Sequence, residues 1–116
     1  MHRDLELTQQ WSAVCTLDQI VPDTGVCALL NGRQVAVFRV GDAAPRLFAI
    51  DNHDPNSGVA VLSRGLVGSI GERIVVASPL YKQHFDLQTG ECLEAPQHSV
   101  ASYPVRVEDG HVWVGA

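Results

Sequence analysis

The sequence predicts an all-β protein, built as a small antiparallel sandwich or barrel with short helical turns. Short runs rich in Val, Ile and other strand-forming residues are separated by Gly, Asn and Asp at close intervals. Asn-Gly and Asp-Gly pairs fall between such runs, and almost no stretch has the apolar spacing of a helix. Because 116 residues can bury one hydrophobic core, we expect a single domain over residues 1–116 with its core at about 11–114.

The first part of the chain predicts one helical turn and the clearest hairpin. Residues 16–20 favour a helical turn, with Thr16 as a candidate N-cap and Pro22 closing it. Residues 26–30 and 33–39 are predicted to pair as a hairpin, because the Asn-Gly pair between them is preferred in two-residue type I′ turns.

The middle of the chain predicts two strands, each leading into a loop. A hairpin loop at 41–46 precedes the strand 47–50, which enters a first polar loop. Residues 73–77 are rich in β-branched side chains and enter a second loop. The segment 59–72, which contains three glycines, is interpreted as the connection between the two loops.

Two further hairpins are predicted towards the C-terminal end. Residues 85–87 and 91–93 flank a Gln-Thr-Gly turn, and residues 105–108 and 111–114 flank an Asp-Gly turn.

Composition and charge exclude several classes of protein. The chain is 46% hydrophobic and 18% charged, as in ordinary globular domains. Its net charge is -5 and its basic residues are scattered, so no nucleic-acid footprint is present. No apolar run approaches the ~18 residues of a membrane helix, and the polar N-terminal segment does not resemble a signal peptide. We therefore expect a soluble cytoplasmic protein without nucleic-acid or membrane partners.

The cysteines and the known catalytic motifs give no sign of an active site. Cys15, Cys27 and Cys92 are far apart, with no Cys-x-x-Cys or Cys-x-x-His, and are interpreted as free thiols. The sequence also has no Gly-rich phosphate loop and no Gly-x-Ser-x-Gly.

The two polar loops carry the most informative pattern in the chain. Residues 50–58 read Ile-Asp-Asn-His-Asp-Pro-Asn-Ser-Gly, and residues 78–87 read Ser-Pro-Leu-Tyr-Lys-Gln-His-Phe-Asp-Leu. Together they resemble the two loops of a Rieske domain, in which Cys-Pro-His-x-Gly and Cys-Pro-x-His hold a [2Fe–2S] cluster. Matched residue by residue, the four ligand positions are Asp54, Asn56, Ser78 and Tyr81.

These four side chains are poor ligands for such a cluster. A Rieske cluster needs two thiolates and two imidazoles, whereas a carboxylate, an amide and two hydroxyls do not match the softness of an iron–sulfide core. Pro55, Pro79 and Gly58 retain the turn chemistry of the loops. We therefore expect the loops to be kept as a shape, with the cluster absent and no cofactor or metal in this chain.

The resemblance becomes more specific along the chain. From Trp11 to Val114 the sequence is similar to the small subunit of bacterial assimilatory NAD(P)H-dependent nitrite reductase, a family with a Rieske-like fold lacking the cluster ligands. The segments that carry the similarity are 24–29, 51–55, 61–65, 77–87 and 103–107. One departure is Asn56, where the family pattern leads us to expect Phe.

This resemblance implies an accessory role in nitrate assimilation. The large subunit of such a reductase holds FAD, an iron–sulfur cluster and sirohaem, and reduces nitrite to ammonium. The small chain is then expected to be non-catalytic and to bind and support the large subunit, through the loop tips that face the redox partner in true Rieske proteins.

Five residues in or near these loops are candidates for the partner interface: Asn56, Arg64, Tyr81, Lys82 and His84. Tyr81 suits an interface, but it also suits the space that a cluster would fill. His84 is equally consistent with a partner contact and with capping of backbone groups at a strand start. Lys82 fits an acidic partner or a simply solvated surface charge.

Other classes of function remain as alternatives. Asp51, His53, Asp54 and His84 include metal-ligand types, but neighbouring residues of an extended loop point in opposite directions, and a catalytic ion needs at least three converging ligands. A Rieske-type ferredoxin-like electron carrier with atypical ligands is a second hypothesis. A free-standing binding module for another reductase or an oxygenase is a third.

Overall fold

The computed structural model describes residues 10–116, and the all-β prediction is confirmed over that range. All strand pairs in it are antiparallel, and its only helical segments are three 3-10 turns. The first nine residues, on which the expected absence of a signal peptide depends, lie outside the described range. No helix between residues 10 and 116 is long and apolar enough to cross a membrane.

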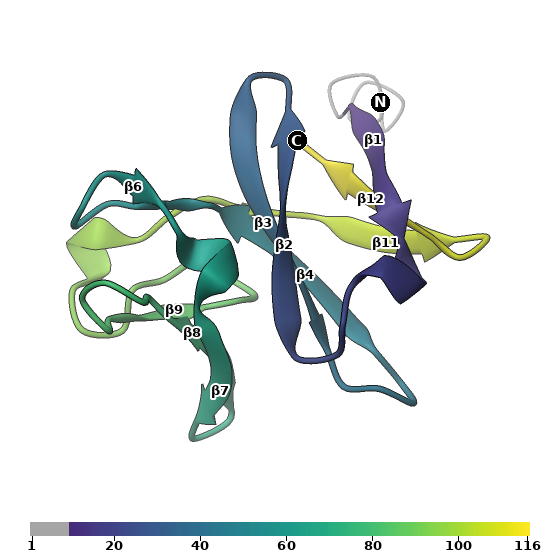
Figure 1. Cartoon of the computed structure of the whole chain (residues 1–116). Coiled ribbons are helices and arrows are strands. Elements are labelled where there is room, and N and C mark those ends of the chain that lie inside the picture. The colour runs from purple at the N-terminus through teal and green to yellow at the C-terminus, as the bar shows by residue number, and fades with distance from the viewer. Residues whose placement is uncertain (1–9) are drawn as a thin grey trace, which may run out of the picture.

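The strands form three main sheets (Figure 1). The first has the order β1 (Trp11–Thr16), β12 (His111–Gly115), β11 (Val105–Glu108). The second has the order β10 (Ser102–Tyr103), β4 (Arg46–Asp51), β3 (Arg33–Val40), β2 (Thr24–Leu30). The third has the order β7 (Leu66–Ile70), β8 (Arg73–Ala77), β9 (His84–Asp86). A short ladder joins β5 (His53–Asp54) to β6 (Val59–Ala60).

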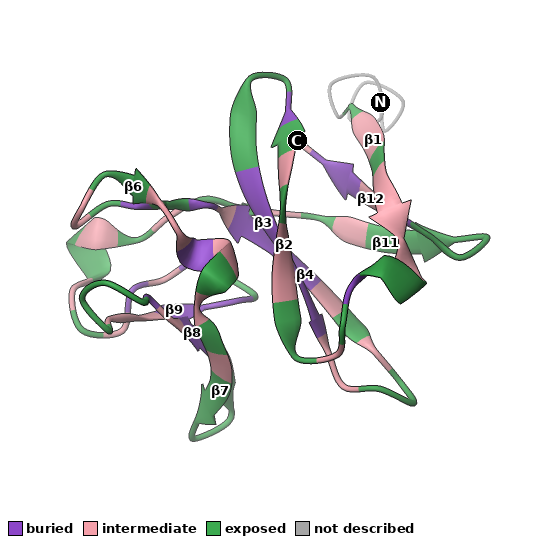
Figure 2. Ribbon diagram, in the orientation of Figure 1, coloured by how far each residue is buried: buried purple, intermediate pink, exposed green. Residues whose placement is uncertain are grey.

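The central residues of β3 and β4 are buried, as Figure 2 shows in purple, and their side chains enter two hydrophobic cores on opposite faces. Successive strand residues point to opposite faces, so Val35 and Val37 enter one core while Ala36 and Phe38 enter the other. The first core lies against β12 and contains Ile20, Leu30, Val35, Val37, Ala49, Val112 and Val114. The second lies towards the two loops and contains Ala36, Phe38, Phe48, Ile50, Leu62, Val76, Phe85, Leu87 and Cys92.

Two predicted hairpins form with the expected turns. Asn31 and Gly32 both have positive φ, 51° and 78°, as a type I′ turn requires. Asp109 and Gly110 repeat this with φ of 53° and 75°, and join β11 to β12. The predicted helical turn is a 3-10 helix, η1 (Leu17–Gln19), with Thr16 at its N-cap.

Other elements differ from the prediction. Strands β1 and β7 were not predicted, because β1 is interrupted by a bulge between Ala13 and Cys15, and β7 is a mostly exposed strand containing Gly68. The hairpin around residues 88–90 forms only in part. Its N-terminal strand, β9, ends at Asp86. The expected partner strand is reduced to an isolated β-bridge between Phe85 and Cys92.

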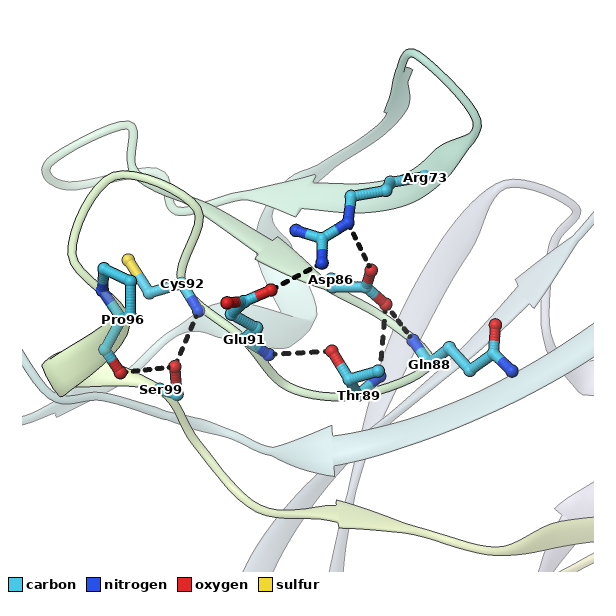
Figure 3. A network of polar contacts seen from close by, with 8 residues as sticks. All are labelled: Arg73, Asp86, Gln88, Thr89, Glu91, Cys92, Pro96 and Ser99. Carbon is cyan, nitrogen blue, oxygen red and sulfur yellow. Dashed lines mark hydrogen bonds and ion pairs between the residues drawn. The ribbon is translucent and has the colours of Figure 1, made fainter.

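A polar network fixes this partial hairpin (Figure 3). Asp86 accepts hydrogen bonds from the backbone N–H groups of Gln88 and Thr89, at 2.7 and 3.1 Å. Arg73 lies 3.4 Å from Asp86 and donates to Glu91 at 2.5 Å. Side chains therefore hold the chain reversal where the backbone ladder is incomplete.

The segment that precedes β7 packs tightly against β8. It contains the 3-10 helix η2 (Leu62–Arg64), and Leu62 is fully buried in the second core. A Cβ atom added to Gly65 would lie 2.3 Å from the carbonyl oxygen of Ala77, whereas one added to Gly68 would meet no atom within 4 Å. Gly65 therefore lets the connection approach the base of the second loop.

Gly65→Ala should destabilise the fold by about 1–3 kcal/mol, since overpacking against a fixed backbone forces the chain apart. Gly68→Ala is the matched control and should be neutral or stabilising by up to ~1 kcal/mol, because its φ is not strained. The urea unfolding midpoints of the two variants and the parent measure this difference. Equal midpoints would contradict the packing argument.

Candidate functional site

The two polar loops meet through a buried carboxylate and hydroxyl. Asp54, at the end of β5, is fully buried, and Ser78, just after β8, is 1% exposed. The Ser78 hydroxyl donates a hydrogen bond of 2.5 Å to Oδ2 of Asp54. These residues stand at the two positions where a Rieske domain carries its cysteines. A hydrogen bond thus joins the loops where a cluster would otherwise bridge them.

A second bridge lies beside the first. The backbone N–H of Asn56 donates to Oδ1 of Asp54 at 2.8 Å, and its side-chain amide donates to the same oxygen at 3.3 Å and to Oε1 of Gln83. The buried thiol of Cys92 also points to that Gln83 oxygen, at 3.8 Å. We call Asp54, Asn56, Ser78 and Gln83 the loop clasp.

Each loop is also closed by its own backbone. In the first loop, the N–H of Gly58 donates to the carbonyl of Asp54 at 2.7 Å. In the second, Ser78 accepts from the N–H of Lys82 at 2.9 Å and donates its own N–H to the carbonyl of Gln83 at 2.8 Å. The loop tips are therefore held from within as well as by the clasp.

Tyr81 points outward, so the interpretation that it folds into the space of a cluster is wrong. Its exposed fraction is 61%, and that of its neighbour Leu80 is 49%. The buried Asp54 and Ser78 are instead hydrogen-bonded to each other between the loops. Tyr81 instead lines an open hollow together with Asn56 and Gln83.

His84 is engaged within the chain. Its backbone N–H donates to Oε1 of Glu94 at 2.8 Å, and its ring Nδ1 lies 2.6 Å from Oε2. Burial acts to raise the pKa of Glu94, but the hydrogen bonds from the backbone and ring of His84 outweigh it and hold the pKa below its usual value. The pair ties the start of β9 to the segment that follows Cys92, which favours the capping interpretation of His84.

The two remaining interface candidates are exposed cations. Arg64 ends η2, and Lys82 lies at the second loop tip. Asn52 anchors η2, because its side-chain oxygen accepts the N–H of Ser63 at 2.7 Å. The structure therefore joins Asn56, Tyr81 and Lys82 at the loop tips, while Arg64 stands on the adjoining 3-10 helix and His84 lies beneath.

The donor set of the loops does not fit a [2Fe–2S] cluster. Asp54 and Ser78 are hydrogen-bonded to each other, and Asn56 bonds Gln83, so none of them offers a free soft ligand. Between residues 10 and 116, no three His, Cys, Asp or Glu side chains are grouped to hold a metal ion. Asp51, one of the metal candidates, instead accepts a 2.5 Å hydrogen bond from Tyr103.

Sequence reasoning missed three residues of this region. Gln83 and Glu94 are the partners of Asn56 and His84, but each is a common polar residue whose role depends on a contact with another segment. Leu80 was not singled out, because the sequence does not show that this apolar side chain is exposed.

Ser78→Ala should lower the free energy of unfolding by about 1–3 kcal/mol, because it leaves the buried Asp54 carboxylate without one of its donors. Ser57→Ala is the control, since the Ser57 hydroxyl accepts a 3.2 Å hydrogen bond at an exposed turn of the same loop and should cost less than ~1 kcal/mol. Urea unfolding measures both. Equal losses would show that the clasp does not stabilise the loops.

Glu94→Gln should lower stability at pH 7 by less than ~1 kcal/mol, because the pair with His84 is partly exposed. A carboxyl with a lowered pKa stabilises the fold above its unfolded pKa of about 4.3 and ceases to do so as pH falls through the folded pKa. The difference between variant and parent should therefore begin to fall near the unfolded pKa and vanish once the pH is below the lowered folded pKa of Glu94 as well. Thermal unfolding from pH 7 to 3 tests this, with Glu72→Gln as an exposed control. A difference that is as large at pH 3 as at pH 7 would contradict it.

Comparison with known proteins identifies the family to which this fold belongs. The sequence-family model of the Rieske-like [2Fe-2S] domain matches residues 10–115 of this chain. The nitrite reductase (NADH) small subunit of Salmonella typhimurium is 50% identical over 103 residues, which cover 89% of this chain and 94% of that protein. The solution structure of the E. coli protein NirD has a TM-score of 0.85 at 47% identity, covering 93% of this chain and 97% of that one.

A further relative is much longer than this chain. The nitrite reductase [NAD(P)H] large subunit of Klebsiella oxytoca is 44% identical over 108 residues, which cover 93% of this chain but span only 11% of that protein. The chain therefore belongs to the Rieske-like [2Fe-2S] domain family and, within it, to the nitrite reductase small subunits.

Proposed function

We propose that this chain is the accessory, non-catalytic small subunit of a cytoplasmic NAD(P)H-dependent nitrite reductase that forms ammonium in nitrate assimilation. In this proposal a single domain over residues 1–116 binds the large subunit, which carries FAD, sirohaem and an iron–sulfur cluster. The similarity to named small subunits over nearly their whole length supports the assignment.

The partner is supported by the Klebsiella oxytoca relative. In that protein, a stretch similar to this chain belongs to a polypeptide named as a large subunit. Two units on one polypeptide have a high effective concentration for each other. A separate small chain must bind the large subunit through its own interface. The exposed surfaces of this chain are therefore where that interface is sought.

One observation carries the proposal that this chain works by binding and not by electron transfer. The clasp uses the side chains at three of the four cluster-ligand positions for hydrogen bonds between the loops, and the fourth, Tyr81, points to solvent. A Rieske-type electron carrier would need two thiolates and two imidazoles there. We therefore propose that the chain holds no cluster and that its loops serve as a preformed surface.

The proposed interface is centred on the loop tips. Leu80 and Tyr81 expose apolar area beside an open hollow lined by Asn56 and Gln83. Aromatic residues are enriched at the centres of interfaces, where they anchor in pockets of the partner. The backbone closure of the second loop fixes this surface before binding, which lowers the entropic cost of association.

The test is nitrite-dependent NAD(P)H oxidation by the purified large subunit, titrated with this chain. The parent should give a saturable gain. Tyr81→Ala should need about thirtyfold or more of the chain for half of that gain, since truncating an aromatic anchor costs about 2 kcal/mol or more. Val107→Ala is the matched control, because Val107 is a 41% exposed apolar residue on β11, far along the chain from the loops.

This chain, purified alone, should be free of iron and of visible absorption. Stoichiometric iron would support the electron-carrier alternative. A colourless chain that neither associates with the large subunit nor changes turnover would overturn the assignment and leave a binding module for another partner.

A further inference from the structure

The backbone of Lys82 has an unusual conformation. Four non-glycine residues between positions 10 and 116 have positive φ: Asp23, Asn31, Lys82 and Asp109. Asn and Asp tolerate the left-handed region comparatively well, whereas a long side chain such as Lys is rare there. Lys82 adopts φ 59°, at a loop tip where a glycine would have no steric conflict. Such outliers concentrate at functional sites, where the surroundings hold them in place.

Lys82 also carries a charge without a partner in the described part of the chain. Five basic residues there contact an acid, a phenol or an aromatic ring: Arg33 with Tyr103, Arg39 with Asp42, Arg46 with Phe48, Arg73 with Glu91, and Arg106 with Trp11. Lys82 and Arg64 have no such contact within residues 10–116.

These two cations are attached to the same short stretch of chain. The N–H of Lys82 bonds the carbonyl of Ser78 at 2.9 Å. Gly65, directly after Arg64, packs against the carbonyl of Ala77. Leu80 and Tyr81 expose apolar area next to Lys82. The second loop thus presents the free charge of Lys82 beside an apolar tip, and the free charge of Arg64 lies on η2, which packs against the base of that loop.

We propose that Lys82, assisted by Arg64, is a cationic anchor for an acidic patch on the large subunit, an inference that rests on the proposed function. The chain has a net charge of -5, so most of its surface repels an acidic partner. The free cations then determine which face approaches, because opposite charges steer the encounter and fix its orientation. The left-handed backbone sets the direction in which the Lys82 side chain leaves the loop.

The experiment measures the dissociation constant of the chain and the purified large subunit over a series of salt concentrations. Lys82→Asn keeps a residue that tolerates positive φ but removes the charge, whereas Lys82→Gly also relaxes the backbone. Lys82→Arg keeps the charge. Asp109→Gly is the control, because it removes a charge at a left-handed position of the distant β11–β12 turn.

The parent should bind more weakly as salt rises, since exposed charge pairs are screened. Lys82→Asn and Lys82→Gly should bind about fivefold more weakly at low salt, with a shallower salt dependence, while Lys82→Arg and Asp109→Gly keep the parent behaviour. Lys82→Gly should unfold at a temperature no lower than the parent, which separates lost binding from lost folding.

The alternative outcomes distinguish the two proposals. If the parent binds but all Lys82 variants share its affinity and salt dependence, the cationic anchor is wrong and the assignment as a small subunit stands. If Lys82→Gly binds weakly but Lys82→Asn binds like the parent, backbone rigidity and not charge is responsible, and the anchor is again wrong. If the parent does not bind at all, the proposed function fails.

Discussion

The burial of β3 and β4 on both faces is the constraint on which the rest of this structure depends. Val35 and Val37 pack towards β12, while Ala36 and Phe38 pack towards the loops. Each fully buried large apolar side chain contributes roughly 1.5–3 kcal/mol, so this central pair of strands joins two cores that neither outer sheet could form alone. The second core also contains Phe85 of β9, only three residues after Lys82 at the loop tip. The position of the loop tips is therefore set by the same packing that stabilises the centre.

The loop clasp shows how hydrogen bonds between side chains can join the two loops. A cluster would bridge the loops by covalent metal–sulfur bonds, whereas here Ser78 donates to Asp54 and Asn56 donates to Gln83. A buried carboxylate is costly unless it is hydrogen-bonded. The Asp54 carboxylate accepts hydrogen bonds from three donors. Because these bonds form only when the loops are folded together, the clasp and the fold stabilise each other. The buried residues Asp54 and Ser78 therefore stabilise the loops, whereas the exposed Leu80 and Tyr81 are the ones that the proposed partner could contact.

The exposed tip has the properties expected of the proposed binding surface. Tyr81 and Leu80 are open to solvent, Lys82 has a left-handed backbone, and His84 is paired with Glu94 below the tip. A group that is already hydrogen-bonded within the chain has little capacity to bind a partner. His84 therefore supports the loop, whereas Leu80, Tyr81 and Lys82 are exposed at its tip. Rigid presentation favours association, because less conformational freedom is lost on binding.

The sequence by itself determined the all-β class, the type I′ turns at Asn31-Gly32 and Asp109-Gly110, and the identity of the two loops, because these depend on local turn chemistry and on residue type. Only the tertiary structure decided that Tyr81 faces solvent and that Asn56 bonds Gln83, since these depend on contacts between segments distant in sequence. The strand β7 escaped prediction for the same reason, because its mostly exposed residues are ordered by pairing with β8 and not by their own pattern. Local chemistry was readable from the chain, whereas the direction of a loop side chain required the fold around it.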